Sequence, residues 1–372
     1  MKRTTAWWAL SPTASVKARP ARPETDGQGS DGQSIDMYQS EDGYQAWQAA
    51  WRWLCRRRRH APANADIWDV WYHWPRECDR LYRVVTAGKY RLSPLLMLRS
   101  GGQGTAVAQW SARDALVLKW VSLLIQGKIP VHACCVHVAG HHGGRTSLQR
   151  IAGGLREGMH HIYRTDIRGY YRHIRKKQLY AQVIRYVQEP VLQDLIYQYL
   201  HYSVEDGGEI HTPATGICRG CALSPYLGAT LLYYVDSYFS RGEGVKYVRY
   251  MDDFLFLSDR RWPVRRARHR LHEFFDTGGF DCHPDKTFIG RAQKGFDWLG
   301  VWFTDQGATG IAPRALQNHR ERRLRLEEQS RRRGLTEEAV ALRMQRYEAR
   351  WQTWADNQLR AARQGSAPGT AM

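Results

Sequence analysis

The chain has 372 residues, enough to bury a large core and to form two or three domains. Lys and Arg total 55 against 36 Asp and Glu, a formal net charge of +19, and 15 Trp and 20 Tyr accompany this charge. The balance favours a polyanionic partner, held by its phosphates and stacked through its bases, over a charged surface without such a role. No apolar run approaches the ~18 residues of a membrane span, so no membrane partner is expected. The apolar stretch in "MKRTTAWWAL" is too short for a signal peptide.

Seven cysteines in irregular spacing do not indicate a disulfide framework in a chain of this size, so we expect a reducing, cytoplasmic environment. Cys218 and Cys221 form a lone C-x-x-C pair, which by itself is weak support for zinc. The cysteines therefore assign no function.

The N-terminal region is predicted to be an unstructured arm followed by helices. Residues 11–42 are rich in Pro, Gly, Ser and Asp and cannot repay their ordering entropy, so the arm is expected to span residues 1–42. A helix is expected from about residue 43 to 58, where Trp47, Trp51 and Leu54 recur on one face. The arginines at its end either contact phosphates or complement the helix dipole. A second apolar helix is expected over residues 111–126, with Ser111 as its cap.

An aspartate follows a short strand-like run in "YRTDIRGYYRHI", residues 163–174. Asp166 ends that run and precedes an aromatic turn that leads into a helix. By itself Asp166 is best explained as a helix N-cap. The alternative is a metal ligand, because two-metal phosphoryl transfer takes carboxylates from separate elements.

Two adjacent carboxylates interrupt an apolar stretch in "YVRYMDDFLF", residues 247–256. The flanking residues predict two β-strands, joined by a tight connection of Met251, Asp252 and Asp253. No glycine eases this turn, and left-handed strain of roughly 1–3 kcal/mol is usually tolerated only at functional sites. Adjacent buried carboxylates repel each other unless a divalent cation is bound. The other explanation is an acidic turn on the surface.

After Pro313 the chain is predicted to form an arginine-rich helical tail, interrupted at Gly334 and restarted by a cap at Thr336. Apolar stripes recur along it, including Val340 and Met344. Such helices either pack on a core with a solvated charged face or lie along a nucleic-acid groove, and their place beside the acidic motifs favours the second.

Five segments together resemble the successive palm motifs of reverse transcriptases, in the order and at the spacing of that family. They are "DIRGYY" from 166, "GICRGCALSPYLG" at 216–228, "YMDD" at 250–253, "HPDKTFIG" at 283–290 and "FDWLGVWF" at 296–303. The resemblance covers residues 145–303, and residues 65–95 resemble the upstream region of bacterial group II intron-like reverse transcriptases.

The resemblance implies an RNA-directed DNA polymerase with two Mg²⁺ ions, for which Mn²⁺ can substitute. Asp166, Asp252 and Asp253 would be the catalytic metal ligands, with the carbonyl of Ile167 as a further ligand. One ion would activate the primer 3′-hydroxyl, and the other would hold the incoming triphosphate. The implied partners are an RNA template, a DNA or RNA primer, dNTPs and a dedicated structured RNA.

Further roles follow from the same resemblance. Tyr171 would select dNTPs by colliding with a 2′-hydroxyl, and this role is favoured over the alternative of a core aromatic. Leu299 and Gly300 would form the primer grip. The remaining nucleotide-binding candidates are Arg168, Arg219, Gly220, Lys286 and Arg113. The chain departs from the family at Arg219, where many relatives have Gln, and in residues 101–114, which lack an Arg-Pro-Leu clamp and for which Arg113 or Lys119 is the expected substitute.

The predicted fold is α+β, a right-hand polymerase. Its expected parts are an arm (1–42), an N-terminal extension with fingers (43–159), a palm (160–303) and a helical thumb (304–372). The alternatives are a non-catalytic maturase-like RNA-binding protein and a template-independent or protein-primed polymerase. Phage defence, a mobile element and DNA repair are all compatible settings.

Overall fold

The computed structural model describes residues 41–98, 107–141 and 143–364. The predicted arm lies outside these ranges, except for its last two residues, which already belong to the first helix, α1 (Glu41–Arg58). The chain divides into two compact units, each discontinuous in sequence. The first comprises Met1–Pro130 and Gly169–Leu231, and the second comprises Val131–Arg168 and Leu232–Met372. Both helices and sheets are present, consistent with the predicted α+β class.

The first unit packs helices around α3 (Ala112–Ile125), whose central residues are buried on all sides. As predicted, Ser111 caps this helix, since its side chain accepts a hydrogen bond from the Asp114 N–H at 3.0 Å. The helices of this unit are α1, α2 (Ile67–Thr86), α3, α5 (Tyr170–His173), α6 (Lys176–Val183), α7 (Pro190–Leu200) and α8 (Ser224–Leu231). The strands β1 (Leu95–Leu98), β2 (Val107–Gln109), β4 (Val204–Asp206) and β5 (Glu209–His211) form a sheet in the order β2-β1-β4-β5.

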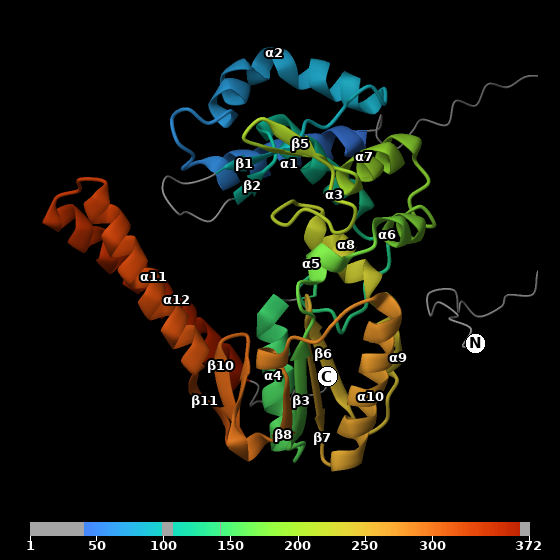
Figure 1. Cartoon of the computed structure of the whole chain (residues 1–372), viewed down its shortest axis with the longest axis vertical. Helices are drawn as coiled ribbons and strands as arrows, with labels where there is room; N and C mark the ends of the chain where they lie inside the picture. The colour runs from blue at the N-terminus through green and yellow to red at the C-terminus, as the bar shows by residue number, and fades with distance from the viewer. Residues whose placement is uncertain (1–40, 99–106, 142, 365–372) are drawn as a thin grey trace, which may run out of the picture. The chain divides into compact units, whose positions relative to one another are not determined.

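The second unit is built on an antiparallel sheet in the order β6-β7-β3-β8. Its strands are β3 (His161–Asp166), β6 (Lys246–Tyr250), β7 (Asp253–Ser258) and β8 (Phe288–Arg291). Helix α4 (Gly143–Arg156) covers one face, and α9 (Tyr233–Ser240) and α10 (Arg261–Gly278) cover the other (Figure 1). The short helices η2 (Pro284–Lys286) and η3 (Ala292–Lys294) flank β8.

Alternation along β7 assigns its side chains to the two faces. Leu255 and Leu257 belong to the cluster that includes Leu148 of α4. Phe254 and Phe256 face the opposite way, where Phe256 contacts Phe239 with ring centroids 4.8 Å apart. Because both faces are covered, the four residues between the ends of β7, Phe254 to Leu257, are all apolar, unlike those of a half-exposed strand.

A second sheet and two long helices complete this unit. Strands β9 (Phe296–Trp298), β10 (Val301–Thr304) and β11 (Gly307–Ile311) form a sheet in the order β11-β10-β9. Helices α11 (Pro313–Arg332) and α12 (Glu337–Arg363) follow, and the predicted break is confirmed, because Gly334 has φ 71° and Thr336 caps α12. Helix α12 packs on α4 and buries Val340 and Met344. None of the described helices could cross a bilayer, as judged by length and hydropathy.

Candidate active site

The connection between β6 and β7 is a two-residue turn of Met251 and Asp252. Tyr250 pairs with Asp253 across the hairpin, so Asp253 is the first residue of a strand and not part of the connection as the sequence had suggested. Met251 has φ 57°, in the left-handed region. The strain expected from the absence of glycine is therefore present, on the residue that immediately precedes the two carboxylates.

Two side chains hold the backbone of Met251 in this conformation. Arg249 donates a hydrogen bond to the Met251 carbonyl at 2.7 Å, and the Met251 N–H donates to Nδ1 of His137 at 3.0 Å. His137 follows a short segment, residues 134–136, whose backbone pairs with β6. The Arg249 N–H donates to the Cys134 carbonyl, and the Val136 N–H donates to the Arg249 carbonyl. Both polar backbone groups of the strained residue are thus bound by side chains.

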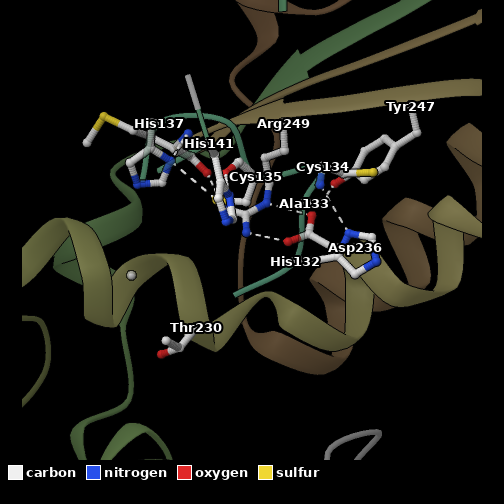
Figure 2. A network of polar contacts seen from close by, with 12 residues as sticks. His132, Ala133, Cys134, Cys135, His137, His141, Thr230, Asp236, Tyr247 and Arg249 are labelled. Atoms are coloured by element: carbon white, nitrogen blue, oxygen red, sulfur yellow. Dashed lines mark hydrogen bonds and ion pairs between the residues drawn. The ribbon is translucent and has the colours of Figure 1, made fainter. Parts of the chain in front are cut away.

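Arg249 is itself fixed by a buried ion pair, shown in Figure 2. Its guanidinium donates to both carboxylate oxygens of Asp236, at 2.8 and 2.5 Å, and both side chains are fully buried. Tyr247 donates a third hydrogen bond to Asp236 at 2.7 Å. Although burial opposes it, the negative charge of Asp236 raises the pKa of Arg249 well above its usual range. Sequence analysis missed this network, whose members show no shared local pattern.

Asp166 lies beside the turn because β3 and β7 are paired. Asp166 and Asp253 are partners in the antiparallel register, and the Ile167 N–H donates to the carbonyl of Asp252 at 3.1 Å. Residues directly opposite each other across a sheet point to the same face, with Cβ atoms about 5 Å apart. Asp166, distant in sequence, is therefore brought beside the adjacent Asp252 and Asp253 at one end of the sheet.

The electrostatics of the site reflect this crowding. Burial raises the pKa of Asp253 to about 6; Arg164 opposes this, and the negative charges of Asp166 and Asp252 reinforce it. Two cations balance part of the charge: Lys286 lies 2.7 Å from Asp166, and Arg164 lies 3.4 Å from Asp253.

Arg164 is a site residue that the sequence analysis did not select. It lies two positions before Asp166 on β3, hence on the same face, and that spacing was the available signal. Its guanidinium also lies 3.6 Å from Asp297, in the "FDWLG" segment. Arg164 therefore links the carboxylate of Asp253 to β9.

Comparison with known protein families identifies the segment that contains these acidic residues. Residues 143–303 match the family model described as reverse transcriptase (RNA-dependent DNA polymerase). Residues 143–303 are a reverse transcriptase domain. The predicted enzyme class is confirmed: an RNA-directed DNA polymerase, which is a nucleotidyltransferase. A comparison with curated proteins finds no match to the chain.

Asp166, Asp252 and Asp253 of the reverse transcriptase domain have side chains of the type that binds divalent metal ions. Carboxylate oxygens are the hard donors that Mg²⁺ prefers, and a divalent cation would offset the burial and the lesser repulsion from Asp166 and Asp252 that together raise the pKa of Asp253. As they stand, no three His, Cys, Asp or Glu side chains in the described ranges are gathered as a metal-holding group. Asp166 and Asp253 are instead turned to Lys286 and Arg164. The chemistry of these oxygens therefore fits a hard divalent cation, whereas their present arrangement does not gather them around one.

The predicted primer-grip residues of the reverse transcriptase domain form another two-residue turn, between β9 and β10. Leu299 has φ 49° and Gly300 has φ 84°. A Cβ on Gly300 would lie 2.8 Å from the ring of Trp354, so glycine is required there. Leu299 packs against α4, where a Cβ on Gly144 would lie 3.0 Å from it.

Most of the other predicted nucleotide-binding residues belong to the first unit. Tyr171 is 8% exposed, and its carbonyl accepts a hydrogen bond from the Ile217 N–H at 2.9 Å. Gly216, before Ile217, has φ 83°, and a Cβ there would lie 2.7 Å from the Arg172 carbonyl. The "GICRG" segment therefore packs directly on the backbone that carries Tyr171.

The basic candidates have diverse surroundings. Arg219 is exposed, and the adjoining Gly220 has φ 79°. Arg113 lies 3.7 Å from Asp69 and 3.6 Å from Glu77, both on α2. The resemblance implied a triphosphate as the partner of Arg113, whereas its side chain in the structure faces these two carboxylates. Lys119 lies over the ring of Trp53 at 5.5 Å. In the second unit, the Arg168 N–H donates to the Asp281 carbonyl and the side chain is exposed.

Proposed function

We propose that the domain extends a primer by two-metal phosphoryl transfer at Asp166, Asp252 and Asp253, with the Ile167 carbonyl as an additional ligand. The observation that carries this proposal is the register of β3 on β7, in which Asp166 lies opposite Asp253 and Ile167 is bonded to Asp252. Two bound Mg²⁺ ions, or Mn²⁺ in their place, would supply Lewis acidity at the 3′-hydroxyl and at the triphosphate.

Each protein group then has a distinct task. The carboxylates of Asp166, Asp252 and Asp253 hold the ions, and Arg164 orients Asp253 through its ion pair. Lys286, now bonded to Asp166, is free to contact the departing phosphates once a divalent ion takes its place. No side-chain nucleophile is needed, because catalysis by this chemistry is positioning and charge stabilisation.

We further propose the roles that the family resemblance implies for the remaining candidates. Tyr171 excludes the 2′-hydroxyl of ribonucleotides, and Leu299 with Gly300 supports the primer end. The candidates for nucleotide contacts are Arg113, Arg168, Arg219 and Gly220. This proposal also keeps the expected fingers, palm and thumb, at residues 43–159, 160–303 and 304–372. These boundaries differ from those of the two compact units into which the chain divides.

The substrates that follow are an RNA template, a DNA or RNA primer and dNTPs. A group II intron-like, bacterial, cytoplasmic enzyme serving phage defence, a mobile element or DNA repair is the setting that we propose, together with a dedicated structured RNA. The high positive charge supports binding of nucleic acid of this kind.

The deciding experiment replaces both turn carboxylates, in Asp252→Ala with Asp253→Ala. Incorporation of labelled dNTP on a primed RNA should fall by a factor of about 10³ or more, since the metal site loses most of its ligands. Affinity for the primed RNA should stay within about twofold. Asp259→Asn is the matched control, because Asp259 is an exposed acidic residue just beyond the other end of β7.

Full incorporation by the double variant would remove the catalytic assignment. Loss of incorporation in the Asp259→Asn control as well would point to a general effect of charge. Sequencing the product of a reaction without added template separates copying from untemplated or protein-primed synthesis. Wild-type protein that binds RNA but incorporates nothing is the outcome expected of a non-catalytic maturase-like protein.

A further inference from the structure

A basic cavity lies in the second unit, at the end of the sheet remote from the acidic turn. The cavity measures about 780 Å³ and lies between α10, the start of β3, and β8 with η3. His161 lines it and begins β3, whereas Asp166 ends that strand. Five strand residues at about 3.4 Å each separate the two ends by roughly 17 Å. The cavity is therefore distinct from the proposed catalytic site.

Its lining is strongly and uniformly positive. Five cationic side chains line it, namely Arg261, Arg265, Arg268, Arg291 and Lys294, together with three histidines. No acidic residue lines the cavity as it is described. Within residues 41–98, 107–141 and 143–364, none of the five is paired with a carboxylate.

Two other arginines at α10 do have carboxylate partners. Arg270 lies 2.5 Å from Glu273, and Arg260, just before the helix, lies 3.3 Å from Asp259. These two carboxylates are thus paired with arginines outside the cavity, and Glu273 also lies 3.3 Å from His269, which lines it. A concave surface that keeps its cations unpaired focuses a positive potential and attracts anions.

The positive charge around the cavity also affects the pKa values of its histidines. Burial, with the positive charges of Arg291 and Arg261, lowers the pKa of His161. Burial and the charge of Arg268 likewise lower the pKa of His272. A bound anion would be stabilised by the same field that disfavours protonation of these rings.

The arrangement suits an extended ligand with phosphates and bases. Arg261, Arg265 and Arg268 follow the i, i+4, i+7 spacing along one face of α10, which covers about 10 Å of helix. Arg291 and Lys294 line the same cavity from β8 and η3, so its cations come from separate segments of the chain.

An exposed aromatic ring adjoins these cations. Trp262 is 66% exposed, and the guanidinium of Arg265 lies over its ring at 5.5 Å. An exposed indole beside a basic groove is a platform on which a nucleobase can stack. A free inorganic anion has no base to stack on this indole ring.

We propose that this cavity binds the phosphodiester backbone of a single-stranded nucleic acid, with a base stacked on Trp262, as a second nucleic-acid site separate from the acidic turn. The site holds an unpaired stretch of RNA or DNA while the other end of the sheet carries out synthesis. It does not depend on the two-metal mechanism, since none of its residues belongs to the acidic cluster.

The test measures binding of labelled single-stranded RNA and DNA 20-mers to the full-length protein by fluorescence anisotropy, in EDTA and without dNTPs. The variant Arg265→Gln with Arg268→Gln is compared with Arg260→Gln with Arg266→Gln, which removes the same charge from exposed positions outside the cavity. The cavity variant should bind at least one of the two strands about tenfold more weakly. Its slope of log K against log salt should shrink by about 1.4, for two lost phosphate contacts on a single strand.

The control pair should keep the wild-type slope. Equal affinity and slope in both double variants, on RNA and on DNA, would overturn the proposal. Trp262→Ala should weaken oligonucleotide binding while leaving competition by inorganic tripolyphosphate unchanged. If the cavity variant loses only dATP or tripolyphosphate binding and keeps its oligonucleotide affinity, the ligand is a free polyphosphate and the strand assignment fails.

Because no metal or dNTP is present, these results are independent of polymerase activity. Repeating the measurement with Asp252→Ala and Asp253→Ala should give wild-type binding. An inactive polymerase would therefore leave the cavity result interpretable, and a negative cavity result would leave the catalytic proposal standing.

Discussion

Two hairpin turns of the second unit hold a non-glycine residue in the left-handed region, and they are stabilised by different forces. Met251, with φ 57°, is bound through its backbone by Arg249 and His137. Leu299, with φ 49°, is stabilised by apolar packing against α4, and Gly300 beside it lies against Trp354.

The difference indicates what each turn must do. Directional hydrogen bonds from buried groups fix the orientation of a backbone more narrowly than apolar contact does. The Met251 turn precedes two carboxylates, Asp252 in the turn and Asp253 at the start of β7, and the proposed mechanism requires their oxygens to be placed to within a fraction of an ångström. At the second turn the strained residue Leu299 is held by apolar packing, and the adjoining Gly300 N–H donates a hydrogen bond to the Asp297 carboxylate at 3.2 Å. Polar substitutions and pH should therefore affect the first turn more strongly, and changes of volume the second.

The largest effect is expected from Arg249→Met. It leaves the buried carboxylate of Asp236 unpaired, and such a change typically costs about 3–5 kcal/mol, which urea denaturation would measure. Adding Asp236→Leu and Tyr247→Phe should restore most of the stability, because apolar groups then replace the whole polar network. Incorporation should stay low in the triple variant, since the Met251 carbonyl still lacks its donor. A fully active triple variant would show that the network serves stability alone.

The next effect is a pH dependence of stability in metal-free protein. Burial raises the pKa of Asp253 to about 6, above its value of ~3.9 in an unfolded chain. The contribution of Asp253 is therefore fully present below pH ~4 and is lost as the pH rises through about 6, by up to about 3 kcal/mol. Asp253→Asn should flatten the difference between unfolding curves at pH 4 and pH 7, and Mg²⁺ should offset the loss in the wild type. Identical pH profiles for wild type and variant would contradict the interpretation.

The Leu299 turn should respond instead to a single methyl group. Gly300→Ala introduces a Cβ 2.8 Å from Trp354 at φ 84°, and left-handed strain with this overlap should cost about 2 kcal/mol of unfolding free energy. Gly310→Ala is the control, because a Cβ there meets nothing within 4 Å and Gly310 has no positive φ. Thermal unfolding that is equally affected by both changes would remove the packing argument.

The smallest effect is expected from His137→Leu, which removes the acceptor of the Met251 N–H. One buried donor left unsatisfied should cost about 1 kcal/mol in the population of the correct turn, and kcat for incorporation should fall by roughly five- to tenfold. His137→Asn places an acceptor in the same position and should largely preserve activity.

In a Met251→Gly background the cost of His137→Leu should diminish, because glycine adopts the left-handed turn without help. An undiminished cost there would mean that His137 acts by another route.

The sequence alone predicted the features that depend on near neighbours. The caps at Ser111 and Thr336 and the break at Gly334 are determined within a few residues, by backbone sterics and local hydrogen bonds. The hairpin at Met251 was also predicted from its neighbours, although His137, 114 residues away, helps to hold the strained residue. The family resemblance located the reverse transcriptase domain for a similar reason, since its motifs are short and contiguous.

Only the tertiary structure decided which charges meet. Lys286 and Asp166 are 120 residues apart, and Arg164 and Asp253 are 89 apart, so no local pattern could have paired them. The basic cavity likewise combines α10 with the start of β3 and with β8, three segments brought together by strand pairing and helix packing. Electrostatic interactions depend on distance in space, which the order of residues does not contain until the sheet has formed.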